Sequence, residues 1–262
     1  MMRLHLDKGI WAIAMLATLG FPGAPGATPP VCTATFATRL NFSDSQYTAC
    51  FTDVRRGADI NDDGAPDLGG TGHTALNFTG GAGPVGDTWV TKWTPNGGTQ
   101  LCIAAQIEAD VLIHTYNNTK GAGLVALLDP APGGKGLALI LYDQGNSDAL
   151  QLATIDPATG RLGKLKSVSL DAGIVENAWY FLQIRVIAHG DQVSVDGRVF
   201  RHVTPTNPNS PVMLFLKLNF LGSLSALGLE DSGEVGIAAS AFSTNVNSSV
   251  TNFVILSCTE PT

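Results

Sequence analysis

Short apolar segments separated by turn residues are the feature that most constrains how this chain can fold. The chain has 30 glycines and 14 prolines, and stretches such as "PGGKG", "DQGNSD" and "DPATG" separate the apolar segments. Helical patterns are hard to find, and many short strands with frequent turns are typical of antiparallel sandwiches and barrels. The segments with strand patterns are "WVTKW" at 89–93, "LCIAAQIEADVLI" at 101–113, "GLVALL" at 123–128, "LALILYD" at 137–143, "WYFLQIRVI" at 179–187, "QVSVDG" at 192–197, "VMLFLKLNF" at 212–220, "VGIAASAF" at 235–242 and "VTNFVILS" at 250–257.

The segment at 179–187 favours a sandwich. Alternate side chains of an extended strand point to opposite faces of its sheet. One face of this strand is apolar and would lie against a core; it carries Tyr180, Leu182, Ile184 and Val186. The opposite face is amphipathic and carries Trp179, Phe181, Gln183 and Arg185.

Residues 1–26 have the pattern of a signal peptide. Arg3 and Lys8 flank a short polar start, a mostly apolar run follows, and small residues at positions 24 and 26 suit cleavage after Gly26. The run is too short to span a bilayer comfortably, and no later stretch is long enough; an uncleaved membrane anchor is the alternative. We therefore expect a secreted or cell-surface protein with a short linker at 27–31 and one domain at 32–262.

Charge and cysteine content narrow the class of protein. The formal net charge is −7, so the chain lacks the basic field that phosphate backbones require, and nucleic acid is excluded as a partner. All four cysteines, at positions 32, 50, 102 and 258, follow the leader, and an even count in an exported protein favours two disulfides. Four cysteines allow three pairings, and no Cys-x-x-Cys pair supports a zinc ribbon.

Several motifs, in order, resemble a known family. They are "AGLVALL" from Ala122, "WYFLQIRV" from Trp179, the nearby "HGDQVSV", "GEVGI" from Gly233 and "VTNFVI" from Val250. This order is similar to that of laminin-G-like domains of the concanavalin A-like lectin/glucanase superfamily. The resemblance implies an all-β fold, an antiparallel two-sheet jelly-roll sandwich. It implies much less about activity, because this fold hosts lectins, glycoside hydrolases and adhesive modules.

The same resemblance implies that the N- and C-terminal strands lie side by side. That arrangement would join Cys32 to Cys258 and leave Cys50 to meet Cys102. The segment at about 53–74 departs from the family pattern and reads as an Asp-rich insertion.

A catalytic pair is incomplete in this chain. The endo-glucanases of the superfamily carry a Glu-x-Asp-x-x-Glu strand motif; here Glu108 and Asp110 fit, but Ile113 stands at the second glutamate. A retaining glycosidase needs two carboxyl groups about 5–5.5 Å apart, flanking the glycosidic bond. A solvated strand face is therefore favoured over a hydrolase site for this pair.

Trp179, Phe181 and Arg185 form a candidate ligand-binding face, because they share one face of their strand. Aromatic rings are what pyranose faces stack on. The alternative is that the Trp packs against the sandwich, as the resemblance implies for this position.

"DINDDGAPDLGG" at 59–70 is a candidate calcium loop. The loop has residues at five of the positions that supply oxygens in an EF-hand, namely Asp59, Asn61, Asp63, Ala65 and Asp67. It also resembles the loops of dockerins. Two departures are Gly70, where a bidentate Glu is usual, and Pro66 at position 8. The alternative is a metal-free Asp/Asn/Gly turn.

Together these patterns predict a secreted, non-catalytic binding or adhesion module, with glycans as a candidate ligand and calcium as a structural brace. The rival interpretations are a secreted glycoside hydrolase or lyase with an atypical site, and a purely structural surface protein. Extracellular glycans or surface proteins are the expected partners.

Overall fold

The computed structural model describes a large part of the chain after the predicted linker. The described residues are 32, 40, 49–55, 59–61, 75–79, 87–114, 120–131, 134–143, 147–241 and 247–261. No helix within these ranges is long and apolar enough to cross a membrane. The predicted signal peptide and linker lie outside them.

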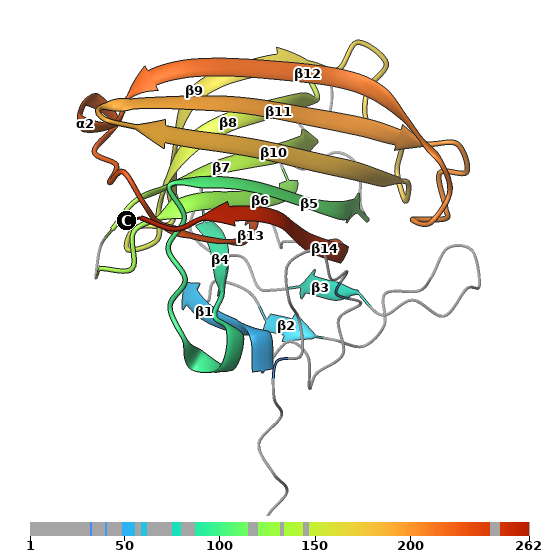
Figure 1. The fold of residues 1–262 in the computed structure, drawn as a ribbon. Coiled ribbons are helices and arrows are strands. Elements are labelled where there is room, and N and C mark those ends of the chain that lie inside the picture. The colour runs from blue at the N-terminus through green and yellow to red at the C-terminus, as the bar shows by residue number, and fades with distance from the viewer. Residues whose placement is uncertain are drawn as a thin grey trace, which may run out of the picture.

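Within the described residues the strands form two seven-stranded sheets, in which neighbouring strands pair antiparallel (Figure 1). Sheet I contains, in spatial order, β1 (Phe51–Arg55), β4 (Asp87–Trp93), β13 (Glu234–Ala241), β6 (Lys120–Leu128), β7 (Gly136–Asp143), β8 (Ala149–Asp156) and β9 (Arg161–Ser169). Sheet II contains β12 (Val212–Ser223), β11 (Gln192–His202), β10 (Trp179–His189), β5 (Ala104–Ile113), β14 (Asn247–Thr259), β3 (Leu76–Thr79) and β2 (Asp59–Asn61). The named helices are the single turns η1 (Pro95–Gly97) and α2 (Leu224–Leu227). The predicted antiparallel jelly-roll sandwich is confirmed.

The core lies between the two sheets. The apolar face predicted for β10 belongs to it, because Tyr180, Leu182, Ile184 and Val186 are at most 1% exposed and pack into the main cluster. β6 and β7 are buried along their whole length. Accessible side chains on the sheets are therefore found chiefly on the outer face of sheet II and on the edge strand β9.

The predicted disulfide pairing is wrong. The bonds join Cys32 to Cys50 and Cys102 to Cys258. Cys258 lies opposite Ala105 in the β14–β5 ladder, so its neighbour is the cysteine just before β5.

The first cysteines are held elsewhere, at the corner after β4. The Cys50 carbonyl accepts a hydrogen bond from the Thr94 amide at 2.8 Å, and the Cys32 amide donates to Asn96 Oδ1 at 2.7 Å. β1 belongs to sheet I and β14 to sheet II, so the first and last described strands are not neighbours. The N-terminal segment does reach β14 at Leu40, which forms an antiparallel bridge with Phe253, but Cys32 is held beside Asn96 and not beside Cys258.

Candidate functional site

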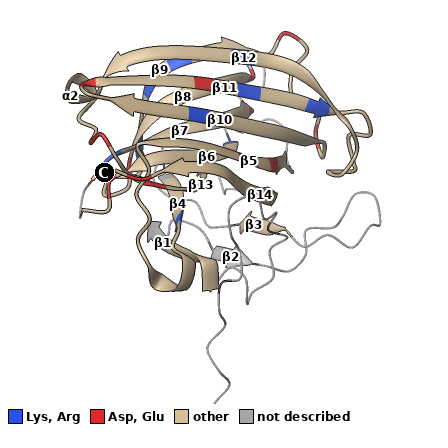
Figure 2. Ribbon diagram, in the orientation of Figure 1, with Lys and Arg blue, Asp and Glu red and all other residues tan. Residues whose placement is uncertain are grey.

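The outer face of sheet II carries polar and aromatic residues in cross-strand rows. The register of β5, β10, β11 and β12 aligns these rows across four strands. The first row holds Gln106, Arg185, Asp196 and Asn219, and the second holds Glu108, Gln183, Arg198 and Lys217. We call these eight residues the polar platform. Figure 2 shows acidic and basic residues near one another on β10 and β11.

Asp196 is the centre of the charge network on the platform. Its Oδ1 accepts a hydrogen bond from Arg198 Nε at 2.7 Å, and its Oδ2 lies 2.8 Å from Lys217 Nζ. Partial burial raises the pKa of Asp196, but the hydrogen bonds and charges of Arg198 and Lys217 outweigh that effect and hold the pKa below its usual 3.8. The carboxylate is therefore ionised at neutral pH and fixed in orientation.

A shallow, open groove lies beside Asp196 over the paired strands β11 and β12. It is lined by Ser194, Val195, Asp196, Asn219, Phe220 and Leu221 and has a volume of about 420 Å³. The paired residues Asp196 and Asn219, one strand apart, bring a carboxylate and an amide to the same stretch of this groove. Carboxylates accept hydrogen bonds and amides both donate and accept, so together they match the hydroxyl groups of a polyol.

An aromatic row adjoins the platform. Phe181 and Phe200 are cross-strand partners whose ring centroids lie 5.5 Å apart at an interplanar angle of 60°. Both side chains are half-buried, and the next residue along the row, Leu214 on β12, is 58% exposed. The row therefore offers apolar surface directly beside hydrogen-bonding groups.

Glu108 and Asp110 point to the same outer face but differ in what they contact. Glu108 accepts a hydrogen bond from Gln183 Nε2 and is 7% exposed. Asp110 has no exposed surface; its Oδ1 lies 2.6 Å from His202 Nε2, and its Oδ2 accepts from Asn252 Nδ2 at 2.7 Å. Asp110 is therefore enclosed and cannot contact a substrate together with Glu108.

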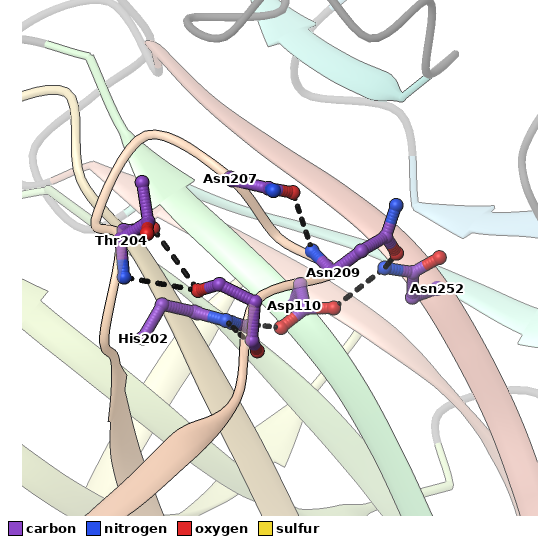
Figure 3. Close-up of polar contacts among 7 residues, drawn as sticks. Asp110, His202, Thr204, Asn207, Asn209 and Asn252 are labelled. Carbon is purple, nitrogen blue, oxygen red and sulfur yellow. Dashed lines mark hydrogen bonds and ion pairs between the residues drawn. The ribbon is translucent and has the colours of Figure 1, made fainter.

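The loop at 203–211, which joins β11 to β12, is anchored on this buried carboxylate (Figure 3). His202 Nδ1 lies 3.1 Å from the Ser210 carbonyl oxygen, and the Ser210 hydroxyl bonds to both backbone groups of Thr204. Asn252 Nδ2 also donates to Asn209 Oδ1 at 3.4 Å. The loop therefore closes the end of sheet II next to the aromatic row.

The ligand-binding residues predicted from sequence differ in accessibility. Trp179 is 3% exposed and packs with Ala75 and Leu112, whereas Phe181 is half-buried and Arg185 is exposed. Trp179 lines a small pocket of about 100 Å³ together with Tyr180 and His202. Phe181 and Arg185 are accessible on the outer face. They lie on the rows described above.

The partners of these residues on β11 and β12 were not identified from the sequence. The stretch "QVSVDGRVFRH" of β11 alternates buried and accessible residues, and this alternation alone places Asp196, Arg198 and Phe200 on one face. The strand pattern predicted from the sequence ends at residue 197, so it does not include Arg198 and Phe200.

The candidate calcium loop can be placed only in part. Asp59 and Asn61 belong to β2, where the backbone pairs with β3 and the side chains are not described. Asp63, Ala65 and Asp67 lie outside the described residues. Within the described ranges, no group of three or more His, Cys, Asp or Glu residues could hold a metal ion.

Comparisons with known proteins concern the fold. No family model and no curated protein matches the chain. Among solved structures, a carbohydrate-binding module, CBM66, from Bacillus subtilis is 11% identical, with a TM-score of 0.47 over 80% of this chain and 96% of that one. Lectin II from Ulex europaeus is 9% identical, with a TM-score of 0.45 over 84% and 98% of the two chains. Arcelin-5 from Phaseolus vulgaris is 12% identical, with a TM-score of 0.45 over 83% and 96%.

Proposed function

We propose that this protein is a non-catalytic glycan-binding module whose ligand lies across the outer face of sheet II. The observation that carries the proposal is the adjacency of the polar platform and the Phe181–Phe200 row. Sugars present both hydroxyl groups and apolar ring faces, and protein sites for such ligands combine a few fixed polar groups with aromatic surface.

Each part of this face has a distinct role in the proposed complex. Asp196 is fixed by Arg198 and Lys217 and still has lone pairs that can accept from sugar hydroxyls. Asn219, the cross-strand partner of Asp196, lines the same groove and supplies both a donor and an acceptor. Phe181 and Phe200 supply the apolar surface for a ring face.

A glycoside hydrolase is less well supported by the same geometry. The acid that would accompany Glu108 is Asp110, which is enclosed by His202 and Asn252. Analysis of the glycan after incubation would show this alternative directly, because cleavage changes its chain length.

The proposal is tested by binding of the protein without its leader to a glycan array, followed by calorimetric titration with the best ligand. Asp196→Ala should weaken binding about 10- to 100-fold, since hydrogen bonds to charged groups contribute about 1.5–3 kcal/mol and each 1.4 kcal/mol is tenfold in affinity. Asp171→Ala is the matched control, because Asp171 is an exposed carboxylate in the turn before β10, away from the platform. Absence of binding to any glycan, or equal loss in both variants, would overturn the proposal.

We also propose that calcium braces the segment that contains Asp59 and Asp63. Calcium takes six to eight oxygen ligands, and a loop without the usual bidentate Glu should bind weakly, with a dissociation constant on the order of 10⁻⁴–10⁻³ M. Calcium at one to ten times that constant should stabilise the protein by about 0.4–1.4 kcal/mol. Calorimetry of the EDTA-treated protein should show a higher melting temperature with added calcium, and Asp63→Ala should abolish the increase. Equal melting temperatures with and without millimolar calcium would contradict a calcium site and identify the loop at 59–70 as a metal-free turn.

Export is part of the same proposal. Two disulfides suit an oxidising compartment. The mass of the secreted protein should place its N-terminus within a few residues of Ala27.

A further inference from the structure

We infer that the preferred ligand of the polar platform is an acidic glycan, whose carboxylate or sulfate group is bound by Arg185. This inference rests on the proposed function, since it names the class of glycan for the same face of sheet II. It follows from the balance of charge on the platform, the exposure of each charged group, and the partners that each one has.

The platform is locally basic although the protein is acidic. Three cations, Arg185, Arg198 and Lys217, share it with two acids, Glu108 and Asp196. The whole chain has 22 acidic and 15 basic residues. The excess of cations on the platform is therefore opposite in sign to the net charge of the protein. General attraction by net charge would favour cations, and an anion must therefore be recognised by local contacts.

The cations of the platform are also more accessible than its acids. The side chains of Arg198 and Lys217 are 39% and 42% exposed, against 27% for Asp196. Glu108 is buried and is covered by its hydrogen bond from Gln183. A ligand that approaches this face therefore meets positive charge first.

Arg185 is the cation that remains available for a ligand. Arg198 and Lys217 both bind Asp196, which uses part of their donor capacity. Arg185 is exposed, and no hydrogen bond or ion pair of its guanidinium to another described residue is present. Its guanidinium group can form a paired set of hydrogen bonds with a carboxylate or a sulfate.

The neighbours of Arg185 suit the rest of such a sugar. In the register of sheet II it lies between Gln106 on β5 and Asp196 on β11. An acidic group bound by Arg185 would place the hydroxyl groups of the same sugar near the Asp196 carboxylate and the Gln106 amide. These groups can accept and donate the remaining hydrogen bonds.

The test compares ligands that share a sugar backbone and differ in whether its acidic groups are present and charged. Oligogalacturonate and its methyl ester share one backbone, and dextran sulfate oligosaccharides and dextran form a second pair that separates sulfate from carboxylate. By calorimetric titration, at least one acidic form should bind at least tenfold more tightly than its neutral counterpart, and added salt should weaken that preference because the contact is exposed.

Arg185→Gln should lower the affinity for the acidic form at least tenfold and so remove its preference over the neutral form. Arg161→Gln is the matched control: it removes the same charge from the exposed first residue of β9 in sheet I. The control should retain the preference of the unaltered protein.

The outcomes separate this inference from the proposed function. Equal affinity for acidic and neutral forms would overturn the inference while leaving glycan binding intact. Equal losses in the Arg185 and Arg161 variants would also overturn it, because the effect would then be one of net charge. Absence of binding to every form, together with a silent glycan array, would overturn the proposed function itself.

Discussion

Asp110→Ala is expected to lower the free energy of unfolding by about 2–6 kcal/mol, because it removes a hydrogen-bond partner from each of two buried groups, at about 1–3 kcal/mol each. The side chains of Asp110 and His202 are 1% and 2% exposed, so water does not replace the lost carboxylate. The change also removes the nearer acceptor of the Asn252 amide, whose other acceptor is Asn209 Oδ1. Two buried polar groups would lose the same partner at once.

The loss of stability is expected because the His202 ring has a buried polar contact at each of its two nitrogens. One ring nitrogen faces the carboxylate of Asp110 and the other faces the carbonyl of Ser210, and both of these groups accept hydrogen bonds. Without Asp110 the Nε2 atom of His202 would lose its buried partner, and the loop at 203–211 would lose its anchor.

Urea unfolding at neutral pH measures the effect. Asp171→Ala serves as the control, because an exposed turn residue should change stability by no more than about 0.5 kcal/mol. The double variant Asp110→Ala with His202→Ala should lose less than the sum of the two single variants, since they share one interaction. A loss below about 1 kcal/mol in Asp110→Ala would contradict the buried pair.

The strands that the sequence revealed are those with one clearly apolar face. The alternation in "WYFLQIRVI" identified the buried and outer faces of β10, and both are found in the structure. β9, with the sequence "RLGKLKSVS", was not identified because it is an edge strand whose residues are mostly exposed or half-buried. An edge strand needs little apolar character, since it covers less of the core. Its sequence therefore resembles a loop.

The candidate site was predictable only within one strand. Phe181 and Arg185 follow from the period-two pattern of β10, whereas their partners depend on how β11 and β12 align with it. The pairing of β11 with β12 includes a register shift between Val199 and Phe200, and no local pattern in the sequence predicts this shift. The buried pair of Asp110 and His202 is separated by 92 residues and is likewise a product of the sheet register.

The two disulfides should contribute unequally to stability. The Cys102–Cys258 bond spans 156 residues, and the Cys32–Cys50 bond spans 18. In the chain-entropy account a cross-link stabilises by restricting the unfolded chain, and the effect grows with the logarithm of the loop; the long loop gives about 5 kcal/mol and the short one about 3. The long loop also contains every strand from β5 to β13, so its bond restricts most of both sheets in the unfolded chain.

Paired alanine variants of each disulfide test this expectation by urea unfolding without reductant. The variant lacking Cys102 and Cys258 should be about 2 kcal/mol less stable than the one lacking Cys32 and Cys50. Comparing two paired variants of the same protein cancels the general effect of replacing buried cysteines, since Cys32, Cys50 and Cys102 are all at most 7% exposed. Peptide mapping of the unaltered protein should join Cys102 to Cys258. An equal or larger loss from the short bond would mean that native contacts around β1 and β4, and not the restricted unfolded chain, set the contribution of each disulfide.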